Sequence, residues 1–196
     1  MVVCLPPQIV MPTPKSIAVL ELSSIAIGYE IQDAMLKAAS VELMIARTIC
    51  SGKYFIVLGG GVSDVEAAMQ AGLKAADEAI IDHLLLPNVH PSVFPALGQS
   101  VVIEPEQAGA LGVIETFSGT SALAAADAAA KAARITLFRI HVAMALGGKG
   151  IVLMTGTVAD VRAAVDAGAA EARQRGLLVY ECVIPRPSPE MMREYV

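Results

Sequence analysis

The 196-residue chain contains 55% hydrophobic and only 17% charged residues, whereas a typical soluble domain has about 25% charged residues. Its charge-free stretches, such as Ile140 to Gly148, are shorter than the roughly 20 residues that a membrane-spanning helix needs, so we expect no membrane partner. The net charge of −5 and the absence of a Lys- or Arg-rich run argue against nucleic acid. The surplus apolar residues are expected to lie in contacts between subunits.

Hydrophobic periodicity predicts six elements in the first half of the chain. A helix is expected to follow Ser23 and Ser24 as N-cap residues, and a second helix is expected to open at a capping box formed by Ser63 and Glu66. A tight turn at Ser51-Gly52 is expected to join the second and third strands. The predicted order is strand Lys15–Leu22, helix Ile27–Ala39, strand Val41–Ile49, strand Tyr54–Leu58, a helix reaching about Ile80, and strand Leu84–Leu86.

The second half of the chain repeats the first. Small offsets that grow from 94 to 96 and 98 residues indicate a tandem duplication with insertions confined to loops. The clearest matches are Ile17–Glu21 with Leu111–Glu115, Asp33–Ala39 with Asp127–Ala133, and Gly60–Val65 with Gly156–Val161. Each copy is therefore predicted to be an α+β domain of ferredoxin-like β-α-β-β-α-β order, with both helices on one face of an antiparallel sheet.

The repeat also sets the expected domain organisation. A short tail from Ser188 to Val196 is expected to form a terminal helix, and the proline-rich start of the chain is expected to be an extended or mobile arm. It lacks the basic region of a signal peptide, and three cysteines form an odd count, so we expect reduced thiols in a cytoplasmic protein. The predicted bounds are arm 1–14, first domain 15–97, linker 98–109 and second domain 110–196.

Four motifs together resemble the bacterial microcompartment shell domain. They are the strand Leu111–Thr116, the Asp-x-x-x-Lys-Ala-Ala helix, the Gly-Lys turn and the strand end Val183–Pro187. Two copies in direct order resemble the tandem-domain, trimer-forming class of that family, and Thr48–Lys53 and Asn88–Val93 carry this likeness. The resemblance implies a homotrimer of six domains: a pseudohexagonal tile with a central pore. Such tiles join other shell proteins edge to edge around enzymes in the bacterial cytoplasm, so the implied role is containment and not turnover.

Cys50 is the candidate metal ligand, because it lies at the turn where the family places its pore loops. One cysteine per chain cannot supply the four thiolates that an iron–sulfur cluster normally needs, but a three-fold axis would bring three Cys50 sulfurs together. The resemblance implies one [4Fe–4S] cluster per trimer, used for electron transport or for moving the cluster across the shell, with an encapsulated redox enzyme as a partner. The alternative interpretation is a small apolar turn residue.

The remaining candidate residues lie in the pore loops and at the tile edge. Ser51 and Gly52 flank Cys50, and the matching loop of the second copy contains Ala145, Leu146 and Gly147, which would form an apolar collar without a thiol. Lys37 and Lys131 each follow an Asp by four residues, which also suits a helix ion pair worth about 0.2–0.5 kcal/mol. The resemblance assigns Lys37, Lys131 and Arg186 to contacts between tiles.

Other functions remain open from the sequence. A shell tile with a cluster-free pore would pass metabolites only. A trimeric ferredoxin-like sensor would hold a small molecule in clefts between subunits. A catalytic oxidoreductase is the weakest alternative, because the chain lacks a cofactor fingerprint beyond Cys50.

Overall fold

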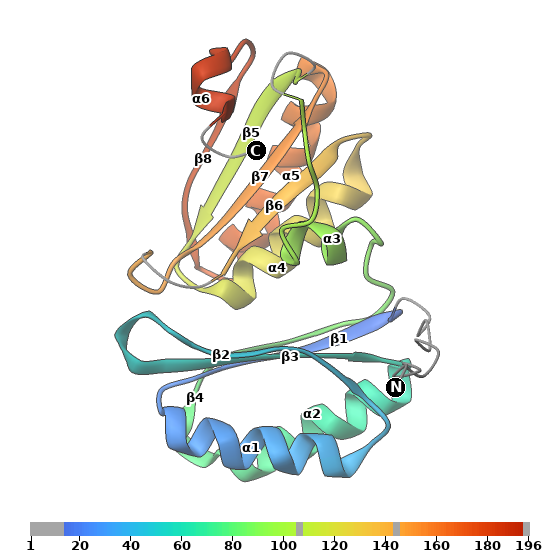
Figure 1. Ribbon diagram of the computed structural model, residues 1–196, viewed down its shortest axis with the longest axis vertical. Helices are drawn as coiled ribbons and strands as arrows, with labels where there is room; N and C mark the ends of the chain where they lie inside the picture. Colours follow the sequence, from blue (N-terminus) through green and yellow to red (C-terminus); the bar gives the residue numbers. More distant parts are fainter. Residues whose placement is uncertain (1–13, 105–107, 143–145, 194–196) are drawn as a thin grey trace, which may run out of the picture.

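The computed structural model describes residues 14–104, 108–142 and 146–193. Each half of the chain forms a four-stranded antiparallel sheet with two long helices on one face (Figure 1). The predicted β-α-β-β-α-β order is therefore confirmed in both copies. The predicted arm, apart from Pro14, lies outside the described residues.

The first domain has strand order β2-β3-β1-β4, and every neighbouring pair is antiparallel. This is the order expected for a ferredoxin-like fold, because each β-α-β connection skips one strand: β3 lies between β1 and β2, and β1 lies between β3 and β4. Its elements are β1 (Ser16–Leu22), α1 (Ile25–Ala38), β2 (Glu42–Ile49), the 3₁₀ turn η1 (Cys50–Gly52), β3 (Lys53–Gly60), α2 (Val62–Ala76), the 3₁₀ turn η2 (Asp77–Ala79) and β4 (Ile80–Leu86).

The ends of the two helices show where sequence interpretation succeeded and failed. Ser24 caps α1 as predicted, since its side chain accepts a hydrogen bond from the Ile27 amide. The predicted capping box of Ser63 and Glu66 is wrong: α2 already begins at Val62, with Gly61 at the N-cap and no side-chain cap. The helix predicted to reach Ile80 ends at Ala76, because Asp77 leaves helical geometry with φ +45°.

The second domain repeats this arrangement with strand order β6-β7-β5-β8. Side chains cap both of its long helices: Ser118 accepts from the Ser121 amide at 2.9 Å, and Thr157 accepts from the Asp160 amide at 3.2 Å. Its elements are β5 (Ala110–Thr116), α4 (Gly119–Ala132), β6 (Thr136–His141), β7 (Gly150–Gly156), α5 (Val158–Gln174), β8 (Leu178–Ile184) and α6 (Pro189–Arg193). The last helix lies in the predicted tail.

The two domains pack through a seam that gives the first sheet helices on both faces. Figure 1 shows α1 and α2 on one face of this sheet, and α4 with the short helix α3 (Val93–Leu97) on the other. Val19, Phe55 and Val57 from the first sheet belong to the same buried cluster as Leu123 and Ala126 of α4. The seam is therefore a continuous apolar core, as expected for a permanent contact.

A polar clamp crosses the seam at its rim. The carboxylate of Asp82 on β4 accepts hydrogen bonds from Arg175 at 2.7 Å and from the Ser118 hydroxyl at 2.8 Å. Both members of the Asp82–Arg175 ion pair are largely buried. A partly buried, hydrogen-bonded pair of this kind fixes the orientation of the two domains better than an exposed pair would.

The outer face of the second sheet carries no second domain in the single chain. Part of it is covered by Ile103 before β5 and by Met192 of α6, which pack on Leu111 and Leu153. Helix α6 covers this sheet as α3 covers the first one, and the two short helices follow matching strands, β4 and β8. Among the described residues, none of the helices is both long and apolar enough to cross a lipid bilayer.

Candidate pore turns and the domain seam

The turn that contains Cys50 is a tight connection at one end of the first sheet. It joins β2 to β3, and its backbone turns through left-handed residues at Ser51 (φ +66°) and Gly52 (φ +72°). Such conformations are easy for glycine and uncommon for serine. Cys50 is half-buried, while Ser51 and Gly52 are exposed. The thiol therefore lies next to the exposed tip of a hairpin.

Each hairpin is anchored by an ion pair between a lysine and a glutamate at matching repeat positions. Lys53 contacts Glu21 at 2.8 Å in the first domain, and Lys149 contacts Glu115 at 2.8 Å in the second. The first pair is the more buried: the Glu21 side chain is 0% exposed, against 30% for Glu115. One Glu21 carboxylate oxygen has no hydrogen-bond partner, so the domain seam encloses an incompletely satisfied charge.

The second hairpin lies against the first. A side-chain carbon placed on Gly148 would be 3.4 Å from the Lys53 Nζ, and Gly148 is buried. Its repeat counterpart Gly52 is exposed and has open space around it. In the second hairpin Leu146 is half-buried and Gly147 is exposed with φ +62°, and Ala145 lies outside the described residues. Both turns thus meet at one corner of the chain (Figure 1).

The predicted edge residues lie at the opposite ends of the domains. Lys37 and Lys131 are in the last turns of α1 and α4, and both form the predicted i,i+4 pairs, with Asp33 at 2.5 Å and with Asp127 at 2.6 Å. Arg186 is exposed beyond β8. Because Ile184 pairs with Leu111 at the start of β5 while Gly150 pairs with Thr116 at its end, Arg186 and the pore turn are separated by the length of the sheet.

The two described thiols, Cys50 and Cys182, belong to no metal-ligating group among the described residues. Among residues 14–104, 108–142 and 146–193, no group of three or more His, Cys, Asp or Glu side chains is arranged to hold a metal. Cys182 lies on β8, where burial raises the pKa of its thiol, and Cys4 lies outside the described residues. The described residues of one chain therefore do not supply a ligand set for a cluster at Cys50.

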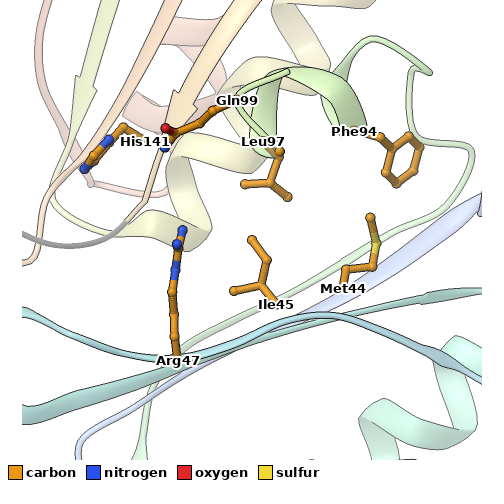
Figure 2. A pocket seen from close by; sticks show the side chains of 8 residues that line it. Met44, Ile45, Arg47, Phe94, Leu97, Gln99 and His141 are labelled. Atoms are coloured by element: carbon orange, nitrogen blue, oxygen red, sulfur yellow. The ribbon is translucent and has the colours of Figure 1, made fainter. Parts of the chain in front are cut away.

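A cavity of about 480 Å³ opens along the seam (Figure 2). Sequence interpretation missed this cavity, because its walls come from the first domain, the second domain and the segment between them. The available signal was the repeat itself: Arg47 and His141 occupy matching positions, each near the end of the strand before a pore turn. The described residues that line it are Met44, Ile45, Arg47, Phe94, Leu97, Gly98, Gln99 and His141.

Comparison with known proteins gives one family for both halves of the chain. The model of the BMC domain matches residues 16–89 and again residues 110–187. The bacterial microcompartment shell protein PduT of Citrobacter freundii is 44% identical over 182 residues, which cover 93% of this chain and 98% of PduT. The carboxysome assembly protein CcmO of a Synechococcus strain is 31% identical and matches 82% of this chain but 61% of its own length.

Solved structures agree with the sequence comparison. A crystal structure of a microcompartment protein from Desulfitobacterium hafniense is 43% identical, with a TM-score of 0.84 over 91% of this chain and 98% of that one. The fused permuted hexameric shell protein MSM0275 from the RMM microcompartment is 25% identical, with a TM-score of 0.59 over 80% and 81% of the two chains. The chain therefore belongs to the BMC-domain family of bacterial microcompartment shell proteins and carries two BMC domains in tandem.

Proposed function

We propose that this protein is a trimeric tile of a microcompartment facet, with six domains around a pore that carries a ring of three Cys50 thiols. Its role is to contain enclosed enzymes and to control passage through the shell, without turnover of a substrate. The observation that carries the proposal concerns the contact between the two domains. Within one chain, the first sheet packs against α4 of the second domain. The two surfaces that would form the same contact with other chains, the α1 face of the first domain and the outer face of the second sheet, remain exposed or only partly buried.

The helix side of the contact shows this most clearly. Leu123 and Thr120 on α4 are 0% exposed, because the first sheet covers them. Their repeat counterparts on α1, Tyr29 and Ala26, are exposed, and Tyr29 is 61% exposed. Eleven residues of α4 are buried, against three of α1. An exposed apolar helix face of this kind is typical of an interface.

The sheet side is open in the same way. Val19 and Phe55 of the first sheet are 0% exposed beneath α4, while their counterparts Val113 and Ile151 on the second sheet are only partly buried. If the second sheet of one chain receives α1 of the next, the contact within the chain is repeated between chains. A head-to-tail contact forms a ring when its rotation closes, and three tandem chains then supply six domains.

The same repetition brings the pore turns together. Gly148 of the second turn lies against Lys53 of the first. By the same contact, the exposed Gly52 of one chain would lie against Lys149 of the next, so six turns would form one ring. Every second turn would then contribute a Cys50, giving three thiols in all.

The residues fit an iron–sulfur cluster shared by three chains. Cys50 is a half-buried thiol at a hairpin tip, next to the exposed Ser51 and Gly52, and thiolates are the ligands that such clusters use. A bound cluster would supply one-electron transfer. The residues of the chain would hold the thiols at a fixed radius, through the Lys53–Glu21 anchor, and limit water through the apolar Leu146 of the intervening turns. An enclosed redox enzyme would then exchange electrons or clusters through the pore.

Iron and sulfide analysis of anaerobically purified trimer tests the cluster. We expect about four irons per trimer and a brown colour, and loss of both in Cys50→Ser. Cys182→Ser is the matched control, since Cys182 lies on β8 and should keep full iron content. A colourless parent protein after reconstitution with iron and sulfide would support the cluster-free metabolite pore, and equal iron in Cys50→Ser would refute the ligand assignment.

Electron microscopy of the overexpressed protein tests the tile. Flat sheets or tubes are expected if Lys37, Lys131 and Arg186 mediate contacts between tiles. The double variant Lys131→Ala/Arg186→Ala should remain trimeric but lose extended sheets. A discrete trimer that forms no sheets at high concentration would favour the sensor function instead.

A further inference from the structure

The seam cavity combines one charged wall with one apolar wall. Arg47 projects from β2 toward His141 and Gln99, while Ile45, Leu97 and Phe94 line the adjoining part of the cavity (Figure 2). Its volume of about 480 Å³ lies within the range of small-molecule sites, which is about 300–1,000 Å³. Both domains contribute walls, so a bound molecule would contact both sides of the seam.

The Arg47 guanidinium has a hydrogen-bond donor that no group in the described part of the chain accepts. Its Nε is buried and lacks a hydrogen-bond partner, although a guanidinium offers five N–H donors in a planar fork. A buried donor without a partner is costly, and the fork matches the two oxygens of a carboxylate or phosphate. Among the described residues that line the cavity, none is acidic, so the electrostatics beside Arg47 favour an anion.

The wall that adjoins the Arg47 guanidinium is apolar, and packing against the buried core of the seam fixes its side chains. Leu97 is 5% exposed and belongs to the seam core, with Ile45 and Phe94 packed against it. Gln99 follows the end of α3 in a left-handed conformation with φ +54°, where glycine is the usual residue. Its amide is one of the polar groups at the cavity rim, beside Arg47 and His141 (Figure 2).

We propose that this cavity binds a small amphipathic organic anion, with its carboxylate or phosphate on the Arg47 guanidinium and a short apolar chain along Ile45 and Leu97. The site lies within one chain, so its stoichiometry is one per chain and three per trimer. The contact between chains cannot reproduce it, because the counterpart of Arg47 is His141 and the counterpart of Ile45 is Arg139. The site is independent of Cys50 and of the proposed cluster.

Ligand-observed NMR titrations of the full-length protein test the proposal with four probes. Hexanoate and hexyl phosphate carry both features of the ligand, inorganic phosphate carries only the charge, and 1-hexanol carries only the chain. We expect the two amphipathic anions to compete for one site per chain, and the single-feature probes to bind at least about tenfold more weakly. Comparison of hexanoate with hexyl phosphate identifies the preferred head group.

Substitutions locate the site. Arg47→Gln should weaken hexanoate binding about tenfold or more, since it removes a charge-assisted hydrogen bond, and Arg47→Lys should give an intermediate loss. Gln99→Gly removes the rim amide while suiting the left-handed backbone, so it should fold normally and bind a few-fold more weakly. Arg162→Gln, on the exposed surface of α5, is the matched control and should bind as the parent does.

The proposal is overturned if Arg47→Gln and Gln99→Gly, both folded by circular dichroism, bind hexanoate as tightly as the parent. It is also overturned if 1-hexanol binds as well as hexanoate, which would indicate a purely apolar cavity, or if inorganic phosphate equals hexyl phosphate. Iron content of the same preparations reports separately on Cys50, so failure of the anion site and failure of the pore proposal are distinguishable.

Discussion

Tyr29→Asp is the substitution that tests the proposed trimer most directly. Tyr29 lies on α1 at the position that corresponds to the buried Leu123 of α4, and it is 61% exposed in the single chain. An aromatic side chain buries about 150–250 Å², so covering the remaining part of Tyr29 removes about 130 Å² from water. At about 25 cal/mol per Å² this contributes about 3 kcal/mol to each contact between chains.

The expected result is dissociation of the trimer without unfolding of the chain. A loss of about 3 kcal/mol weakens each contact by about a hundredfold, and the buried carboxylate weakens it further. Within its own domain Tyr29 packs against Tyr54, with ring centroids 5.1 Å apart, which costs about 0.5–1.5 kcal/mol when removed. Sedimentation velocity at micromolar concentration should show a monomer, while far-ultraviolet circular dichroism stays that of the parent.

Val62→Asp is the matched control, since Val62 is also exposed and apolar. Its counterpart Val158 in the second domain stays 42% exposed despite the seam within the chain, so Val62 should stay outside the contact between chains. This variant should sediment as the parent does. If Tyr29→Asp also sediments as the parent trimer, α1 is not the contact surface and the proposed ring is wrong.

Three further predictions concern the seam, the helix pair and the second thiol. Asp82→Ala leaves Arg175 and Ser118 without their shared acceptor, and should lower the free energy of unfolding by about 2–3 kcal/mol in urea denaturation; an unchanged midpoint would contradict this role. Gly168→Ala places a carbon 2.6 Å from the Ala125 carbonyl oxygen where α5 crosses α4, so it should lower the free energy of unfolding by about 1–3 kcal/mol in thermal denaturation. The control Ala163→Ser lies on the exposed side of α5 and should lower it much less. Burial raises the pKa of the Cys182 thiol, so its thiolate fraction at pH 8 is lower than that of an exposed cysteine. Peptide mapping should therefore show slower alkylation of Cys182 by iodoacetamide, with a rate that rises toward higher pH. Alkylation of Cys182 at the rate of a model thiol would refute this prediction.

The iron analysis and the anion titrations complement these measurements. Cys50→Ser addresses the chemistry of the pore, Arg47→Gln addresses the cavity in the seam, and Tyr29→Asp addresses the ring on which three converging thiols depend. If the protein is monomeric and still binds the anion, the proposed cavity site stands and the proposed pore is refuted. If the protein is a trimer that contains no iron, the proposed tile stands and the proposed cluster is refuted.

The sequence by itself determined the architecture of each domain. Alternating strands and helical periodicity are local signals, and the repeat supplied each signal twice, so the element order and the α+β class could be predicted before the structure. The lysine pairs were equally predictable, since Asp33 and Lys37 are neighbours on any helix. The errors were at element ends, where one residue decides: Gly61 offers no side chain for a cap, and the left-handed Asp77 ends α2 four residues early.

Only the tertiary structure decided how the two copies differ. Nothing in the helix and strand patterns shows that Leu123 is buried while Tyr29 is exposed, or that Glu21 is enclosed while Glu115 is not. These differences arise because one domain packs against the other in one direction, and burial depends on distant segments meeting in space. The clamp at Asp82 and the cavity at Arg47 have the same origin, since each joins residues that lie far apart in the chain.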